Sequence, residues 1–205
     1  MNDLLYLVYY ISVASGFIPL SLYIENKRLE LVKNNKKYRY LFYFVSFRLL
    51  TELGILILSF AIKNSFPIVH FSVLITYGIV LKIFDSIYSN RFLKIYYLLG
   101  FLVFLFDLFL TSNLFEPCLF SSFITFLVII LLSIRILNLE NISKEDDKLV
   151  SAVFVLYLVL LGYYLFLSFL IQRSQVSNMA TYIMLIFNMF FNIAIAKIIW
   201  SKRMS

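Results

Sequence analysis

The stretch Tyr40-Leu-Phe-Tyr-Phe-Val-Ser-Phe-Arg-Leu-Leu-Thr-Glu-Leu-Gly-Ile-Leu-Ile-Leu-Ser-Phe-Ala-Ile62 decides the fold of this chain, because it is long and apolar enough to cross a bilayer. A helix of about 20 apolar residues spans the hydrocarbon core. Two charges interrupt it, Arg48 and Glu52, which lie about one helical turn apart. A charge at this depth costs at least about 2.5 to 3.5 kcal/mol, so such residues usually face a bundle interior and mark a functional site.

The whole chain has the composition of an integral membrane protein. Hydrophobic residues make up 62% of the 205 residues and charged residues 14%, and the mean hydropathy is +0.93. Such a chain has too little polar surface for a soluble globule. We therefore expect an all-α integral membrane protein, a seven-transmembrane-helix bundle forming a single domain over residues 1–205. The expected spans are about 4–24, 39–62, 67–88, 94–111, 117–138, 149–171 and 178–200.

Lysine and arginine are unequally divided between the two sides of the expected bundle. Cytoplasmic loops carry the excess of these residues, and only Lys63 and Arg173 fall on the poorer side. We expect the N-terminus outside, the C-terminus in the cytoplasm, and anionic lipid headgroups at the basic face. The basic face carries Lys27, Arg28, Lys33, Lys36, Lys37, Arg39, Arg91, Lys94, Arg135, Lys144, Lys148, Lys197, Lys202 and Arg203.

The distribution of lysine and arginine also bears on the partners and the location of the protein. Positive charge is spread along a membrane face and is not gathered on a folded basic domain, so we expect no nucleic acid. The excess of Phe, Ile, Lys, Asn and Tyr fits an AT-rich bacterial genome. These features favour a bacterial inner membrane, with membrane lipids and a membrane or cytoplasmic protein as partners.

Polar side chains recur inside several spans at spacings of three and four, which place them on one helix face. Arg48 and Glu52 form such a stripe in the second span, and Asn188 and Asn192 form one in the last. Counting from the outer ends of the spans at about 1.5 Å per residue puts Glu52 level with Tyr77 and Asn188. We predict a mid-membrane polar layer that could bind a ligand. Its residues are Arg48, Glu52, Tyr77, Tyr157, Tyr164, Asn188 and Asn192.

A simpler interpretation of this layer has equal weight. Arg48 and Glu52 would then satisfy each other within one helix, and the asparagines would join helices through hydrogen bonds worth roughly 0.6 to 2 kcal/mol. Joint replacement of such a pair by apolar residues is tolerated, because a buried ion pair is often no more stabilising than good packing.

A second polar cluster is expected nearer the outer ends of the spans, at His70, Asp107 and Glu116. These are metal-ligand residue types, but no short-spaced pair accompanies them. Cys118 is the only cysteine and His70 the only histidine, so a multi-cysteine site, a bis-histidine haem and a polyhistidine zinc site cannot form within one chain. We predict no metal, no cofactor and no catalytic residue.

The chain resembles the short, uncharacterised seven-transmembrane-helix proteins of Bacteroidota-type bacteria. The resemblance rests on Thr51-Glu52-Leu53 in the second span, on His70 at the start of the third, and on Asn188 with Asn192-Ile193 in the last. It extends along the chain and implies the seven-span topology. It implies no activity.

Three functions are compatible with these patterns. The first is a receptor-like or accessory membrane module, in which the polar layer binds a ligand or ion or switches packing and signals through a partner protein. The alternative is a small-molecule or ion transporter that uses Arg48 and Glu52. The third is an intramembrane lipid-modifying enzyme with Glu52 or Asp107 as acid or base, but no nucleophile accompanies them, so an enzyme is the less favoured class.

Overall fold

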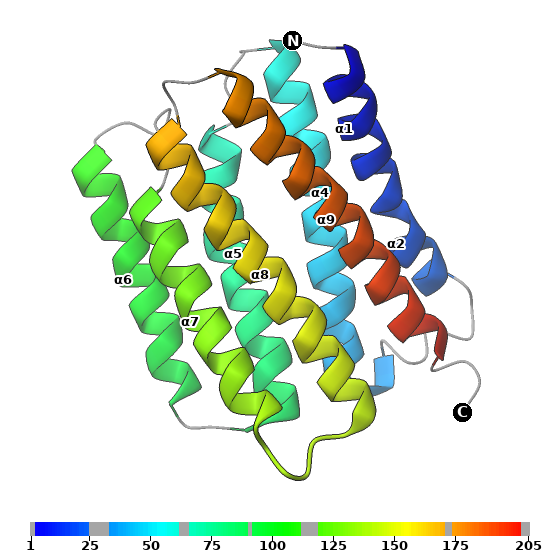
Figure 1. The fold of residues 1–205 in the computed structure, drawn as a ribbon. Helices are drawn as coiled ribbons and strands as arrows, with labels where there is room; N and C mark the ends of the chain where they lie inside the picture. Colours follow the sequence, from blue (N-terminus) through cyan, green and yellow to red (C-terminus); the bar gives the residue numbers. More distant parts are fainter. Residues whose placement is uncertain are drawn as a thin grey trace. The chain divides into compact units, whose positions relative to one another are not determined.

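A computed structural model describes residues 3–24, 33–61, 66–89, 92–111, 119–170 and 174–201. Every regular element in these ranges is an α-helix, which confirms the all-α prediction. The helices are α1 (Asp3–Ser15), α2 (Phe17–Ile24), α4 (Lys36–Ala61), α5 (Phe66–Ile87), α6 (Leu93–Thr111), α7 (Leu119–Leu137), α8 (Lys144–Leu170) and α9 (Ser174–Ser201) (Figure 1).

Six stretches of the described residues are long and apolar enough to cross a membrane. Each overlaps an expected span, so a helical membrane bundle is supported. The remaining expected span, about 94–111 and the fourth along the chain, coincides with the 19-residue helix α6, which is not among the six stretches. The six stretches are Leu4–Ile24, Lys36–Leu58, Ile68–Ile87, Leu119–Leu137, Lys144–Leu165 and Met179–Ser201.

Local sequence explains where several helices begin and end. The first span breaks at Gly16 into α1 and α2, three residues before Pro19. Proline has no N–H to donate to the carbonyl four residues earlier, here that of Ser15, and its ring crowds that carbonyl. At the start of α8, the Ser143 hydroxyl accepts a 3.1 Å hydrogen bond from the Asp146 N–H and donates one of 2.7 Å to the Asp146 carboxylate. This is a helix N-cap.

The chain has two compact units, which we describe separately. Unit 1 comprises Met1–Glu30 and Ile130–Ser205, and unit 2 comprises Leu31–Ile129. The boundary falls inside α7. In unit 1, α9 packs against α1, α2 and α8, and in unit 2, α5 packs against α4 and α6.

In unit 1, α1 and α9 run in the same direction. Ser12 of α1 bonds to Asn188 of α9, and Ser15, one turn later, bonds to Asn192, one turn later. Figure 1 shows the two helices descending together.

In unit 2, the neighbouring helices α4, α5 and α6 are antiparallel, and glycines set their alignment. A Cβ added to Gly54 of α4 would lie 2.8 Å from Cδ1 of Ile68, so α4 and α5 approach closely there. A Cβ added to Gly100 of α6 would lie 2.7 Å from Cδ1 of Tyr77, a buried residue of α5. These contacts fix which residues of adjacent helices share a level.

Two reciprocal tyrosine bonds strengthen the alignment of α5 with α6. The Tyr77 hydroxyl donates a 2.7 Å hydrogen bond to the carbonyl oxygen of Tyr96, and the Tyr97 hydroxyl donates one of 2.9 Å to that of Gly78. Each tyrosine thereby crosses from its own helix to the backbone of the other. A phenol buried in an apolar bundle needs such a partner, because an unsatisfied hydroxyl is costly to bury.

Candidate functional site

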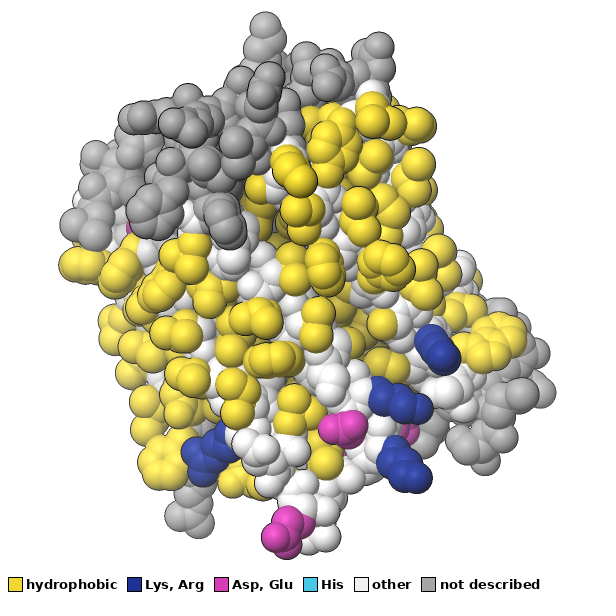
Figure 2. Space-filling model, in the orientation of Figure 1, with side chains coloured by type: hydrophobic (Ala, Val, Ile, Leu, Met, Phe, Trp, Pro, Cys, Tyr) yellow, Lys and Arg dark blue, Asp and Glu magenta, His cyan; other side chains and the backbone are white. Residues whose placement is uncertain are grey.

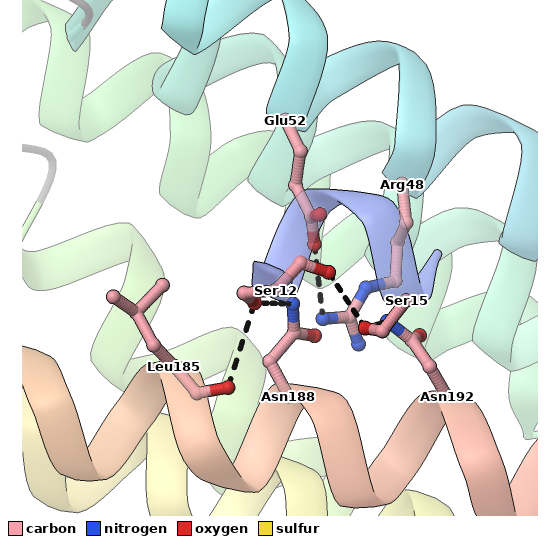
Figure 3. A network of polar contacts seen from close by, with 7 residues as sticks. All are labelled: Ser12, Ser15, Arg48, Glu52, Leu185, Asn188 and Asn192. Atoms are coloured by element: carbon pink, nitrogen blue, oxygen red, sulfur yellow. Dashed lines mark hydrogen bonds and ion pairs between the residues drawn. The ribbon is translucent and has the colours of Figure 1, made fainter. Parts of the chain in front are cut away.

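Arg48 and Glu52 form an ion pair along α4. The Arg48 Nη2 and Glu52 Oε1 atoms are 3.8 Å apart, and each side chain is 18% exposed. The Arg48 guanidinium carbon also lies 5.7 Å from the centre of the Phe44 ring, at cation–π distance. Figure 3 shows the two side chains leaning toward each other along the helix. The pair is mostly shielded, so its charges interact more strongly than they would in water.

The helix alignment places His70 at the level of Glu52. Gly54 of α4 lies opposite Ile68 of α5. Because the two helices are antiparallel, Glu52, two residues before Gly54, lies opposite His70, two residues after Ile68. His70 is completely buried. Counting from the expected ends of the spans gave Tyr77 as the neighbour at this level. The alignment differs because the close contact at Gly54 sets it, and the ends of the two helices do not.

Asp107 of α6 accepts hydrogen bonds from the first turn of α7. One carboxylate oxygen accepts a 3.0 Å hydrogen bond from the backbone N–H of Ser121 and one of 2.6 Å from its hydroxyl. Ser121 is the third residue of α7, where backbone N–H groups have no acceptor within the helix. Asp107 is only 3% exposed, so these two hydrogen bonds are buried at the N-terminal end of α7.

His70 and Asp107 also lie close in level. The rings of Phe71 and Phe104 are 5.9 Å apart, and Tyr97 is bonded to Gly78. These two contacts place Leu105 of α6 opposite His70 of α5. Leu105 is two residues from Asp107, a separation of about 3 Å along the helix axis.

Unit 2 therefore carries four ionisable side chains near one level on three adjacent helices. We call Arg48, Glu52, His70 and Asp107 the ionisable band. The band joins residues that the sequence assigned to two separate clusters. Among the described residues, no group of three His, Cys, Asp or Glu side chains could hold a metal ion. The band can therefore offer paired charges and proton-binding groups, but not an assembled metal site of that kind.

Unit 1 holds a separate set of polar contacts, two rungs that join α1 to α9 (Figure 3). In each rung an asparagine Nδ2 donates a 2.9 Å hydrogen bond to a serine hydroxyl, Asn188 to Ser12 and Asn192 to Ser15. The Ser12 hydroxyl bonds to the carbonyl oxygen of Leu185 at 3.4 Å, and that of Ser15 to the carbonyl oxygen of Ser12 at 2.6 Å. All four polar side chains are buried. This arrangement fits a structural role, and we call the two hydrogen-bonded pairs the joint between α1 and α9.

The tyrosines of the predicted layer have different surroundings. Tyr77 bonds to α6, as described above. In unit 1, Tyr163 of α8 and Thr181 of α9 have hydroxyl oxygens 3.5 Å apart. Six residues before Tyr163 lies buried Tyr157, and six residues after Thr181 on the antiparallel helix lies Phe187, so Tyr157 is one residue from the level of Asn188. Tyr164 is half-buried near the Tyr163 level. Glu116, the remaining residue of the expected outer cluster, lies outside the described residues.

Sequence reasoning missed Ser12, Ser15 and Ser121. The serines of α1 are three residues apart, the same signal that identified the asparagine stripe, and they precede the Gly16–Pro19 break. Ser121 is near the start of its expected span, where a hydroxyl is ordinary. Its partner across the helix pair could not be deduced from spacing within either helix.

Comparison of the chain with protein-family models, with curated proteins and with solved structures gives no match.

Proposed function

We propose that this chain is a receptor-like or accessory membrane module, and that its ionisable band binds a small polar ligand or ion. The observation that carries the proposal is the Arg48–Glu52 pair, 3.8 Å apart and mostly shielded in the middle of a membrane-length helix. Ionisable groups in spans are expensive and usually functional. His70 and Asp107 supply further charge or proton-binding capacity at nearly the same level.

We propose a seven-span topology for this module, with α6 as the span that completes the set. The parallel direction of α1 and α9 supports an odd number of crossings. The distribution of lysine and arginine supports an outside N-terminus, a cytoplasmic C-terminus and a bacterial inner membrane. On the face drawn in Figure 2, hydrophobic side chains cover most of the described surface.

The output of the module would pass through a partner protein, because the connections between its helices are short. Ligand binding would alter the charge balance of the band and so shift the packing of α4 against α5. A ligand can shift such an equilibrium only by its difference in affinity for the two packings. The partner is a membrane or cytoplasmic protein.

Mass spectrometry of the protein released from nanodiscs tests this function. We expect a small molecule, ion or protein partner bound to the wild type, and its loss in Glu52→Gln and in Arg48→Gln. Glu140→Gln, which changes an exposed loop carboxylate, is the matched control and should retain the bound species. If the apolar pair Arg48→Leu with Glu52→Leu retains the same species, the ion pair is only structural and the proposal fails.

A transporter is the second candidate function, and the division of the chain into two compact units favours it. Many transporters work by the movement of one helical bundle relative to another. Proteoliposomes loaded with pyranine would report proton flux, and sodium or potassium gradients would test coupling. Flux that is abolished by Glu52→Gln and kept by Glu140→Gln would assign the protein to this class.

A further inference from the structure

An apolar groove runs along the outer side of the α4–α5 pair in unit 2. Its volume is about 340 Å³. Three of its lining residues are well exposed: Leu50 at 65%, Phe71 at 50% and Ile75 at 42%. In a membrane-spanning helix pair, exposed apolar side chains face lipid hydrocarbon. The groove is lined by Phe47, Leu50 and Thr51 of α4 and by Ile68, Phe71, Ser72 and Ile75 of α5.

The same helix faces continue from the groove to a basic end. Lys82 is seven residues, or about two turns, beyond Ile75 on α5, and Lys36 is eleven residues, or about three turns, before Phe47 on α4. Both lysines are exposed. The helix alignment set by Gly54 puts Tyr40 opposite Lys82. We call the outer face of α4 and α5 the seam. It has an apolar groove and, toward one end, two lysines, of which Lys82 has its ammonium beside Tyr97 of α6.

The spacing of the two parts matches a lipid molecule. Eleven residues of helix separate Phe47 from Lys36, an axial distance of about 16 Å. This distance is about half the hydrocarbon thickness of a bilayer, which is roughly 30 Å. A lipid whose headgroup contacts the lysines could therefore extend its chains to the groove without leaving its own leaflet.

The cationic end has a defined local environment. The Lys82 Nζ atom lies 5.2 Å from the centre of the Tyr97 ring, and the Tyr97 hydroxyl is bonded to Gly78. Asp85 is half-buried three residues beyond Lys82, so one negative charge opposes the two lysines. The seam end keeps a net positive charge and has an aromatic ring at the usual interfacial position.

We infer that the α4–α5 seam is a binding site for an anionic phospholipid, with the phosphate at Lys82 and Lys36 and an acyl chain in the groove. The charge of the seam end selects the headgroup, and the open apolar groove receives the chain. A neutral phospholipid would gain only the second contact. The inference rests on the proposed membrane insertion of the chain but is independent of the ionisable band.

Fluorescence quenching by lipids with brominated acyl chains tests the site. In a Trp200→Phe background, Phe71→Trp puts a reporter in the groove, and Phe109→Trp, at a residue of α6 that is 83% exposed, reports on ordinary surrounding lipid. We expect brominated phosphatidylglycerol to quench the groove reporter at a several-fold lower mole fraction than brominated phosphatidylcholine. The Phe109 reporter should show no such preference.

Lys82→Gln should weaken the phosphatidylglycerol preference of the groove reporter about fivefold, because a basic residue near a membrane surface contributes roughly that factor. Lys148→Gln, at an exposed lysine of unit 1, is the matched control and should leave the preference unchanged. Helicity and elution volume in detergent establish that each variant is folded.

Equal quenching by the two lipids in the groove, the same preference at Phe109→Trp, or no response to Lys82→Gln would each overturn the inference. Band variants such as Glu52→Gln should leave the lipid preference intact, which separates this test from that of the proposed function.

Discussion

At the scale of single residues, three ionisable side chains inside the helices have polar partners. Arg48 pairs with Glu52 one turn away, and Asp107 accepts two hydrogen bonds from Ser121. Residue spacing was sufficient to predict the first pair. It could not predict the second, because the partner of Asp107 lies on another helix and depends on how α6 meets α7.

Removing one member of the Arg48–Glu52 pair should cost more stability than removing both. Arg48→Leu leaves a shielded carboxylate, which we expect to lower the free energy of unfolding by about 1 to 3 kcal/mol. The double variant with Glu52→Leu should recover most of that loss. Denaturation in mixed micelles, followed by circular dichroism, measures all three proteins. A double variant less stable than either single variant would contradict the expectation.

Asp107→Leu should destabilise the junction of α6 and α7. It leaves the Ser121 N–H and hydroxyl without their acceptor, at about 1 to 3 kcal/mol for each buried polar group. Asp107→Asn should cost less, because an amide oxygen still accepts hydrogen bonds but brings no charge to the helix end. Thermal unfolding should rank the proteins as wild type, Asn variant and Leu variant. Glu140→Gln serves as a control with no expected change.

At the scale of helices, close contacts determine the alignment that residue counting could not. Counting residues from the expected span ends placed Tyr77 at the level of Glu52, whereas the contact between Gly54 and Ile68 places His70 at that level. The stripes on individual helices were predictable from periodicity. Their pairing was not, because a missing Cβ can shift one helix along another without changing the sequence pattern of either.

Gly100→Ala should separate α5 from α6. The added methyl group would lie 2.7 Å from Cδ1 of Tyr77, and overpacking of this kind typically costs about 1 to 3 kcal/mol. Gly162→Ala is the matched control, because nothing lies within 4 Å of its added Cβ. That change should be neutral or stabilising, since alanine favours a helix over glycine by up to about 1 kcal/mol. Tyr77→Leu should partly rescue Gly100→Ala in thermal unfolding.

The Ser12–Asn188 rung should show a measurable coupling between α1 and α9. A double-mutant cycle with Ser12→Ala and Asn188→Leu should give about 0.6 to 1.7 kcal/mol, the range of hydrogen bonds between membrane helices. Ser21→Ala with Asn188→Leu is the control cycle, because the exposed Ser21 hydroxyl bonds within its own helix to Ile18. A coupling near zero for Ser12 would show that this rung contributes nothing to the joint.

At the scale of the whole molecule, composition was enough to predict an all-helical chain, and apolar segment lengths predicted the six membrane-length helices of the described residues. The division into two units was not predictable, because it depends on contacts between the first and last helices of unit 1. Those contacts use serines, whose small hydroxyls give a weak sequence signal. The asparagines across from them were easier to single out, because amides are less common in apolar spans.

Topology can be tested with single cysteines in a Cys118→Ser background. Asn141→Cys, in the exposed turn between α7 and α8, should react with a membrane-impermeant maleimide only after cells are permeabilised. Asn113→Cys, between the expected fourth and fifth spans, should react in intact cells. The reverse labelling pattern would invert the proposed orientation, and labelling of both in intact cells would rule out the seven-span arrangement.

The joint between α1 and α9 has a consequence for biosynthesis. Asn188 leaves the ribosome 176 residues after Ser12, whereas unit 2 is one continuous segment that can assemble in the meantime. Unit 1 therefore stays incomplete until the translocon releases its last helix. In that interval the Ser15 hydroxyl can already bond to the Ser12 carbonyl oxygen within its own helix, which keeps this hydroxyl satisfied in lipid until Asn192 arrives.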